Sequence, residues 1–244
     1  MISAKPIAVD DGSPIATSFP GFVELVNKIG GKLTGARKLV IAIDGPAASG
    51  KGTLSRRLAD KLKVPFLDTG AIYRAVGLKL VYANKDPKNK KAAIEAAKNI
   101  SVNDLTNPRI RQESVGNAAS VISSYPEVRE ILLQFQRDFA SNPKGAVLDG
   151  RDIGTIVCPQ ADIKIFMTAS METRAQRRYR EINGEGIEVS YKSVLDDLHE
   201  RDERDSKRKA APLKPAKDAI VIDTTNLSAE EVFNKVWELV ENSL

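Results

Sequence analysis

An apolar segment that runs directly into a glycine-rich loop constrains this chain more than any other part of its sequence. Residues 39–44 read Leu-Val-Ile-Ala-Ile-Asp, and the loop that follows comprises Gly45, Pro46, Ala47, Ala48, Ser49, Gly50, Lys51, Gly52 and Thr53. Small residues let backbone N–H groups point inward at a phosphate tail, and Lys51 adds a positive charge for the outer phosphates. Residues 54–62 have helical periodicity, so a helix N-terminus adds its dipole. The sequence predicts a strand, a loop that binds a nucleoside triphosphate, and a helix.

The hydroxyl residue of this loop stands one position later than in most loops of its kind. Gly52 follows Lys51, and Thr53 comes next. The order G-K-G-T resembles that of the nucleoside monophosphate kinases, whereas most GTPases, helicases and transport ATPases place the hydroxyl directly after the lysine. This variant favours a small-molecule kinase within the larger class.

Length and the scarcity of cysteine and histidine exclude several kinds of site. The chain has 244 residues, 42% of them hydrophobic, which is enough to bury one substantial core. Cys158 and His199 are each the single residue of their type. An internal disulfide, a thiolate metal cluster and a two-histidine metal site are therefore excluded. Any metal ion should be held by oxygen ligands.

Charge and hydropathy limit the partners that we expect. No apolar run approaches the roughly 20 residues that cross a bilayer, and the first residues lack the basic-then-apolar order of a signal peptide. We therefore expect a cytoplasmic protein with no membrane partner. The net charge of +5 makes a nucleic acid one partner to consider. The basic run at 85–91, however, has no interleaved aromatic residues and reads as a solvated loop, so we expect no nucleic-acid partner.

The pattern of apolar runs predicts an α/β fold. Residues 1–36 are expected to be a partly mobile extension, in which Phe22, Leu25, Val26, Ile29 and Leu33 have the spacing of a short amphipathic helix. Residues 37–244 would form the domain. Its strand candidates alternate with helical segments and predict a parallel sheet of about five strands flanked by helices, at 39–44, 64–68, 146–149, 163–168 and 219–223. Asp44, Asp68, Asp149 and Thr168 end four of them and should surround one crevice beside the loop.

Two segments place an arginine just after a predicted strand. In the first, Thr69 is positioned as a helix N-cap, and Arg74 lies one turn into the helix. Arg74 could bind an acceptor phosphate or be an ordinary exposed charge, and spacing alone leaves both open. In the second, Arg151 and Asp152 stand between Gly150 and Gly154 at a strand end. That concentration of charge favours a functional role.

A mixed-charge helix near the C-terminus adds further arginines. Arg201, Arg204 and Arg208 recur at steps of three and four, and Arg201 and Arg208 fall near the side occupied by Val194 and Leu198, which should face inward. We interpret this helix as part of a mobile arm that brings arginines to phosphates, with Asp205 able to pair with Arg201. A second cluster, Arg174, Arg177 and Arg178, is expected to be part functional and part surface.

Several ordered motifs together resemble the bacterial cytidylate kinases. They read I-D-G-P-A-A-S-G-K-G-T at 43–53, L-D-T-G-A-I-Y-R at 67–74, N-A-A-S at 117–120, D-G-R-D-I-G-T at 149–155, E-R-D-E-R-D at 200–205 and A-P-L at 211–213. The resemblance covers roughly residues 38–240 and implies ATP-driven, Mg²⁺-dependent phosphorylation of CMP and dCMP. It also implies a P-loop fold with a monophosphate-binding part near 70–135 and a closing lid near 180–212. The segment 100–113 is shorter than the family's usual insert, and residues 1–36 have no counterpart in it.

The resemblance also implies a role for each matching residue. Residues 45–53 would bind the ATP phosphates, Thr69 and Asp205 the acceptor's sugar side, and Ser120, Arg129 and Asp152 the cytosine. The acceptor phosphate would lie near Arg74, Arg151 and Arg208. Arg201, Arg204 and Arg178 match the lid side, with Arg178 assigned to ATP and Arg201 to the acceptor. The residues expected to stabilise the transferred group are Lys51, Arg151, Arg201, Arg204 and Arg208. No general base is expected, and the protein is expected to be a monomer.

Two other hypotheses are weaker on the residues themselves. A P-loop kinase of another small molecule would not need the positions that match cytosine recognition. A nucleic-acid-stimulated ATPase would need a second ATPase motif or an aromatic platform, and the sequence offers neither.

Overall fold

The computed structural model describes residues 25, 26, 28, 38–184 and 186–243. The chain divides into two compact units, Met1–Arg37 and Lys38–Leu244. Of the helix predicted over 22–33, Leu25, Val26 and Lys28 are helical, and its other positions lie outside the described residues, as does most of the predicted extension. The fold that follows is that of the second unit.

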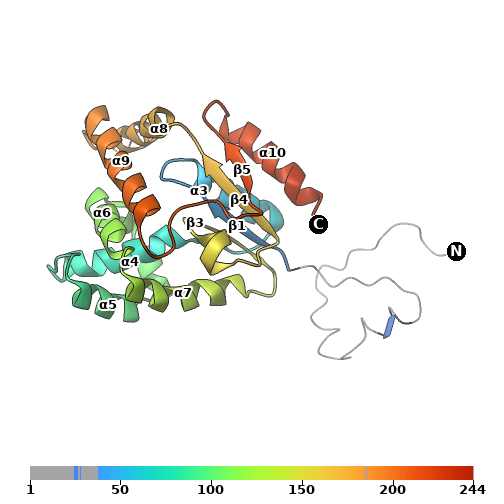
Figure 1. Ribbon diagram of the computed structural model, residues 1–244, viewed down its shortest axis with the longest axis horizontal. Coiled ribbons are helices and arrows are strands. Elements are labelled where there is room, and N and C mark those ends of the chain that lie inside the picture. The colour runs from blue at the N-terminus through green and yellow to red at the C-terminus, as the bar shows by residue number, and fades with distance from the viewer. Residues whose placement is uncertain (1–24, 27, 29–37, 185, 244) are drawn as a thin grey trace. The chain divides into compact units, whose positions relative to one another are not determined.

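Within the described residues, five strands form one parallel sheet in the order β2-β3-β1-β4-β5. They are β1 (Val40–Asp44), β2 (Phe66–Asp68), β3 (Ala146–Gly150), β4 (Ile163–Thr168) and β5 (Ile220–Asp223). All five predicted strands are present, and the predicted α/β class is confirmed (Figure 1). The register pairs Asp44 with Gly150 and Asp68 with Asp149, so the carboxyl ends of β1, β2 and β3 meet at one edge of the sheet.

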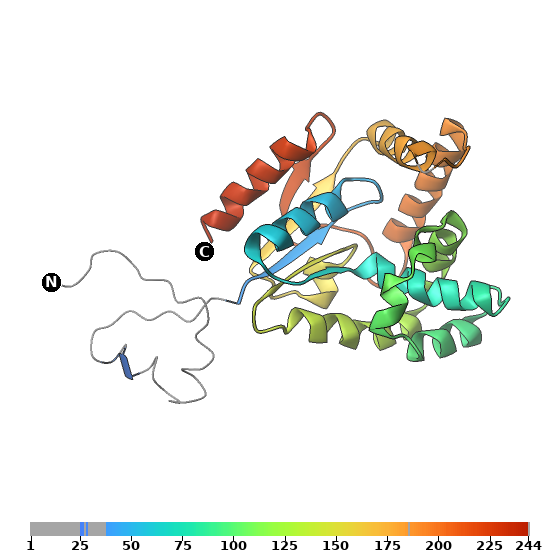
Figure 2. The same ribbon diagram turned by 180° about the vertical axis from the view of Figure 1, so that it is seen from behind.

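Successive side chains of a strand point to opposite faces of the sheet, and both faces carry apolar side chains. Helices therefore cover both faces. Ile41 and Ile43 of β1 pack with α3 and α10, whereas Ala42 packs with α4, α5 and α7. Figure 2 shows α3 in front of the sheet and α7 below it. The α-helices are α3 (Lys51–Leu62), α4 (Thr69–Tyr82), α5 (Lys90–Lys98), α6 (Glu113–Ile122), α7 (Pro126–Ala140), α8 (Met171–Gly184), α9 (Tyr191–Lys207) and α10 (Ala229–Glu241). Val102–Thr106 and Pro108–Arg111 form 3₁₀ turns, and Ile153–Val157 a π-helical turn.

Side-chain caps set several of these helix starts. Ser228 and Glu231 form a capping box at α10, and Ser190 accepts the N–H of Ser193 at α9. The prediction of Thr69 as the cap of α4 is wrong. Asp68 is the cap, since its carboxylate accepts the N–H of Ala71 at 3.1 Å. Thr69 is the first helical residue, and its hydroxyl instead donates to the carbonyl of Asp149 at 2.7 Å.

Helices α8 and α9 form a pair with a small core of their own. Ala175 and Ile182 of α8 are buried against Val194 and Leu198 of α9, which confirms the inward direction predicted for the last two. This helical pair lies at the carboxyl edge of the sheet, at the upper left in Figure 1. Among the described helices, none combines the length and the apolar character that crossing a membrane requires.

Candidate active site

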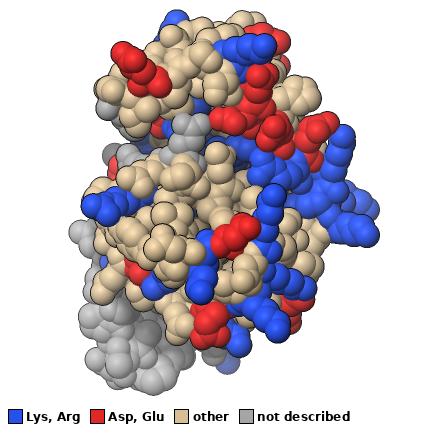
Figure 3. Space-filling model, turned by 90° about the vertical axis from the view of Figure 1, so that its left-hand side faces the viewer, with Lys and Arg blue, Asp and Glu red and all other residues tan. Residues whose placement is uncertain are grey.

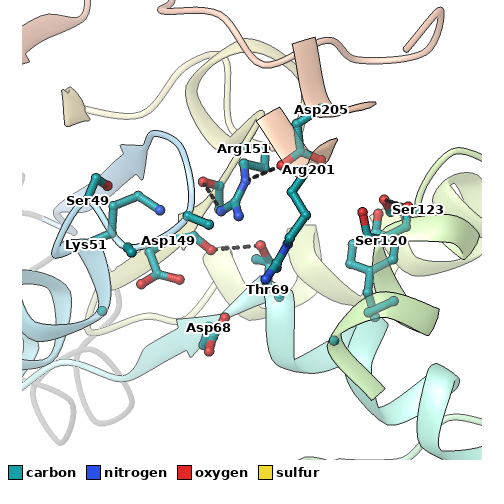
Figure 4. Close-up of a pocket in the computed structure, with 18 of the residues that line it drawn as sticks. Ser49, Lys51, Asp68, Thr69, Ser120, Ser123, Asp149, Arg151, Arg201 and Asp205 are labelled. Carbon is teal, nitrogen blue, oxygen red and sulfur yellow. Dashed lines mark hydrogen bonds and ion pairs between the residues drawn. The ribbon is translucent and has the colours of Figure 1, made fainter. Parts of the chain in front are cut away.

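A cavity of about 340 Å³ opens at the carboxyl edge of the sheet. The phosphate loop forms one end, α4, α6 and α7 form the other, and the segment after β3 and helix α9 lie between them. Figure 4 shows Lys51 and Asp149 at the loop end, Ser120 and Ser123 at the far end, and Arg151 and Arg201 between. The predicted site residues that line the cavity are Ala47, Ala48, Ser49, Gly50, Lys51, Gly52, Thr53, Thr69, Arg74, Ser120, Arg129, Arg151, Asp152, Arg178, Arg201, Asp205 and Arg208.

Backbone conformation gives the phosphate loop its shape. Gly45 has φ +149°, and a Cβ atom there would lie 2.1 Å from the carbonyl oxygen of Met167, so the loop leaves β1 in a way that requires glycine. Gly50 has φ +91° and begins α3. Lys51 folds back so that its Nζ donates to the carbonyl of Pro46 at 2.7 Å. The hydroxyl of Ser49 is buried without a hydrogen-bond partner, which leaves a polar atom in the loop for a ligand.

The charges at the loop end are strongly perturbed by burial. Burial, followed by the nearby Arg151 charge, lowers the pKa of Lys51 to about 7. Burial also raises the pKa of Asp149 to about 7, and the carboxylate of Asp68 adds to that shift. Asp68 and Asp149 both line the cavity. This end of the site therefore holds a buried lysine and a buried carboxylate, with the half-buried carboxylate of Asp68 nearby, an arrangement typical of ligand sites.

The prediction that four strand ends surround the cavity is wrong for two of them. Asp44 does not line it, because its carboxylate accepts the N–H groups of Ile153 and Gly154 at 2.8 and 2.7 Å. Burial raises the pKa of Asp44 to about 6, although those two bonds lower it. Thr168 is likewise absent from the lining, and its carbonyl accepts the N–H of Thr224 at 2.8 Å.

The far end of the cavity contains a buried ion pair and an unpartnered hydroxyl. Arg129 of α7 pairs with Asp152, and Arg208 lies 3.5 Å from the other oxygen of the same carboxylate. The hydroxyl of Ser120 is buried with no partner. Tyr73 also lines this end, with the Arg129 guanidinium 5.6 Å from its ring centre. Sequence reasoning did not single out Tyr73, although it lies between Ile72 and Arg74 in the motif at 67–74.

Arginines from α4, α9 and the segment after β3 occupy the middle of the cavity. Arg151 Nε donates to Asp205 at 2.7 Å, so Asp205 pairs with a residue of another element and not with Arg201, as the helix spacing had suggested. Burial, then the charges of Arg151 and Arg74, lower the pKa of Arg201 to about 10. Burial likewise lowers the pKa of Arg74. Positive groups held so close together favour an anionic ligand.

Three predicted residues lie outside the cavity lining. Gly45 and Pro46 form the loop's entry, and Arg204 points away, with Glu200 of its own helix 3.6 Å from its guanidinium. In the cluster on α8, Arg178 lines the cavity and pairs with Glu181 at 2.9 Å. Arg174 and Arg177 do not line it, and they bond to the carbonyl oxygens of Ala47 and Thr224.

The outer surface near this cavity carries both signs of charge. Figure 3, which looks from the side of the helical pair, shows a constriction between an upper and a lower part, with acidic side chains among the basic ones.

Comparison with known proteins agrees with this geometry. Residues 41–242 match the family model described as cytidylate kinase. The chain is 52% identical over 205 residues to a cytidylate kinase of Methylocella silvestris. That match spans 84% of this chain and 95% of the relative. It is 54% identical over 197 residues to the cytidylate kinase of Paramagnetospirillum magneticum, a match that spans 80% of this chain and 93% of the relative. It is 50% identical over 206 residues to the cytidylate kinase of Rhodospirillum rubrum, a match that spans 83% of this chain and 97% of the relative. The chain belongs to the cytidylate kinase family.

Proposed function

We propose that this chain transfers the γ-phosphoryl group of ATP to CMP or dCMP, giving ADP and CDP or dCDP, as a step of pyrimidine nucleotide metabolism. One observation carries the proposal. A single cavity has a phosphate loop with a buried lysine at one end and the Arg129–Asp152 pair beside an unpartnered serine hydroxyl at the other. Arginines line the space between, where two phosphates would meet.

At the donor end, the loop residues 45–53 would hold the ATP phosphates. Among the described residues, the one hydrogen-bond partner of Lys51 Nζ is the carbonyl of Pro46. The lysine could exchange this bond for one to a phosphate when ATP is bound. An anionic phosphate would favour the protonated lysine, against the burial that lowers its pKa. The Ser49 hydroxyl, which has no protein partner, supports a ligand at this end.

The residues beside the loop fit a Mg²⁺ ion carried by ATP. Asp68, Asp149 and Thr53 line the cavity there and offer oxygen atoms, the donors that Mg²⁺ prefers. The described residues contain no group of three or more His, Cys, Asp or Glu able to hold a metal alone. That agrees with a cation bound through few carboxylates together with phosphates. Bound there, Mg²⁺ would neutralise charge on the phosphates; we assign Asp149, Asp68 and Thr53 to its binding.

At the acceptor end, Arg74, Arg151, Arg201 and Arg208 would bind the monophosphate. Asp152 would accept a hydrogen bond from the exocyclic amine of cytosine, which uracil lacks, and Ser120 would bond to the same base. Thr69 already donates its proton to the carbonyl of Asp149, so toward a sugar hydroxyl it acts as an acceptor. Asp205, bonded to Arg151, would meet the other side of the sugar.

Phosphoryl transfer requires the protein to hold the two nucleotides in line and to stabilise negative charge. The acceptor phosphate is already a nucleophile, so no side chain has to remove a proton from it. Lys51, Arg151, Arg201 and Arg208 would stabilise the negative charge that spreads over the transferred group, and Arg204 would need to turn inward to take part. We propose residues 70–135 as the monophosphate-binding part and 180–212, which contain α9, as a lid whose closure excludes water. A cytoplasmic monomer remains our expectation.

The test is an ADP-release assay with ATP and Mg²⁺ in which CMP, dCMP, UMP, AMP and GMP are supplied separately, with RNA as a control. Turnover confined to CMP and dCMP is the expected result. Turnover with another nucleotide would support a kinase of different specificity, and turnover that rises only with RNA would support the ATPase hypothesis. Either result would overturn the assigned substrate and leave the phosphate loop's assignment standing.

A further inference from the structure

One buried arginine connects the phosphate loop to helix α9 from outside the cavity. Arg174 of α8 is 5% exposed and is not part of the cavity lining. Its guanidinium donates to the carbonyl of Ala169 at 3.1 Å and to the carbonyl of Ala47, in the phosphate loop, at 3.3 Å. The same group pairs with the carboxylate of Asp202 on α9 at 2.6 Å. A single side chain therefore bonds both to the donor site and to the helix that carries Arg201 and Asp205.

We propose that Arg174 and Asp202 are positioning residues that couple ATP binding at the phosphate loop to CMP binding through α9. The inference rests on the proposed function, because it requires these two ligands. Neither residue needs to touch a nucleotide: Arg174 acts through Ala47 of the loop, and Asp202 acts through α9.

Apolar packing joins the same two regions independently. Ala47 of the phosphate loop packs against the small core of the helical pair, together with Met171 and Tyr179. Tyr179 of α8 and Tyr191 of α9 meet edge to face, with ring centres 5.9 Å apart. The loop therefore contacts a helical pair whose two members are fixed to each other, and a shift of α9 changes the surroundings of Ala47.

The acceptor side is attached to α9 one turn further along. Asp205 follows Asp202 by three residues, so the two carboxylates lie on neighbouring positions of one helix face, about 4.5 Å apart along its axis. Asp205 bonds to Arg151, which we assign to the acceptor phosphate. The rigid turn between them links the Arg174 contact to the Arg151 contact.

The Arg174–Asp202 pair is also sensitive to loss. One oxygen of Asp202 is bonded to Arg174, and the other is buried without a hydrogen-bond partner. Without Arg174 this carboxylate would lose its ion-pair partner on α8, although it would still feel the charge of Arg151, so the contact that joins α9 to α8 at this point would weaken. A ligand that favours one position of α9 then favours the same position for the other ligand, and such coupling is reciprocal. Couplings of this kind typically change affinity by roughly 5- to 150-fold.

The experiment measures the coupling directly. Calorimetric titration gives the Kd of adenylyl imidodiphosphate with Mg²⁺, in the absence and in the presence of saturating CMP, and the ratio of the two is the coupling factor. We expect a factor of at least about 5 in the wild type and below about 2 in Asp202→Asn. Arg174→Gln should lower it as well, and the double variant should lower it no further than the single ones.

The matched control is Glu203→Gln. Glu203 is the next residue on α9, the substitution makes the same change of charge, and its partner Lys207 lies 2.8 Å away on the exposed side. Its coupling factor should equal that of the wild type. Arg174→Gln removes several hydrogen bonds, so Asp202→Asn, which removes one ion pair and keeps the side chain's shape, decides the matter if the arginine variant does not fold.

Three results would overturn the coupling. An unchanged factor in Asp202→Asn would show that the pair does not transmit it, and an equal loss in Glu203→Gln would show that any charge change on α9 has the same effect. A wild type that phosphorylates CMP with a factor of 1 would show that no coupling exists. A wild type that neither binds nor phosphorylates CMP would instead overturn the proposed function, and the two failures are thereby distinguished.

Discussion

The two ends of the cavity are built in different ways. The phosphate loop is nine consecutive residues whose shape comes from backbone conformation, with positive φ at Gly45, Ala48 and Gly50 and a single lysine as its charge. The acceptor end draws side chains from α4, α6, α7, α9 and the segment after β3, and it is held by ion pairs such as Arg129–Asp152 and Arg151–Asp205. The phosphate loop is one local motif, whereas the acceptor end is assembled by tertiary structure. Substitutions should therefore affect them differently.

The largest effect should come from removing the charge of the donor end. Lys51→Ala is expected to lower kcat by about 10²-fold or more, as the loss of one electrostatic group that acts on the transition state typically does. The loop's backbone should keep its shape, since the residues with positive φ, Gly45, Ala48 and Gly50, are unchanged. Steady-state kinetics with ATP and CMP measure the effect, and Lys91→Ala, an exposed change on α5, is the control. Near-normal turnover would remove Lys51 from the mechanism.

At the acceptor end, one substitution should change selectivity more than rate. Asp152→Ala is expected to lower the preference for CMP over UMP by about 10- to 100-fold, the range for a lost hydrogen bond to a charged group. It should alter the Kd of ATP much less. The ratio of kcat/KM for the two acceptors measures it. Glu130→Ala, an exposed change beside Arg129 on α7, should leave that ratio unchanged, and an unchanged ratio in Asp152→Ala would refute the assignment.

The contrast between the two ends also explains what the sequence could predict. The strand at 163–168 was predicted with its observed bounds, because local periodicity determines it. The phosphate loop was located correctly, but the helix after it begins at Lys51 and not at residue 54, so the last three residues of the predicted loop are helical. Arg151, Asp152 and Ser120 were singled out through motifs, but the partners of Arg151 and Asp152 were not predicted. Asp205 pairs with Arg151, which is 54 residues away in the chain, and local helix spacing cannot indicate such a partner.

The errors at the strand ends have a related cause. The sequence marks Asp44 as a polar residue at a strand end, and it does not show that the N–H groups of Ile153 and Gly154 lie beside it. Once those bonds form, the carboxylate is used inside the structure and does not face the cavity. Asp68 likewise takes the capping position that Thr69 was expected to fill, because the Thr69 hydroxyl is bonded to β3.

A smaller effect should appear in how the free energy of unfolding of the nucleotide-free protein depends on pH. The pKa of Lys51 is lowered to about 7 in the folded chain, whereas a lysine in the unfolded chain has its ordinary pKa near 10.5. Between these two pH values the unfolded chain therefore binds more protons at this residue than the folded chain does. The contribution of this group to stability should therefore rise with pH in that window. Asp149, whose pKa is raised to about 7, acts in the opposite direction at lower pH, where stability falls as pH rises.

Denaturant unfolding of the wild type and Lys51→Met at pH 7.5, 8.5 and 9.5 measures this contribution. The difference between the two proteins should shrink as pH rises, because the methionine variant lacks the buried amine and is more stable near pH 7.5. A constant difference across the three values would show that the buried donor end does not shift the lysine in the way described.

The smallest expected effect tests the acceptor end alone. The Ser120 hydroxyl is buried and has no protein partner, so Ser120→Ala should leave the free energy of unfolding unchanged or slightly higher. The same change should raise the KM for CMP by about 2- to 12-fold, the equivalent of one hydrogen bond of about 0.5–1.5 kcal/mol. Ser124→Ala is the control, since that exposed hydroxyl donates to Val121 at 2.7 Å and lies outside the cavity. A loss of stability without a change in KM would mean that Ser120 serves the fold, and the acceptor end would then recognise its base through Asp152 and Arg129 alone.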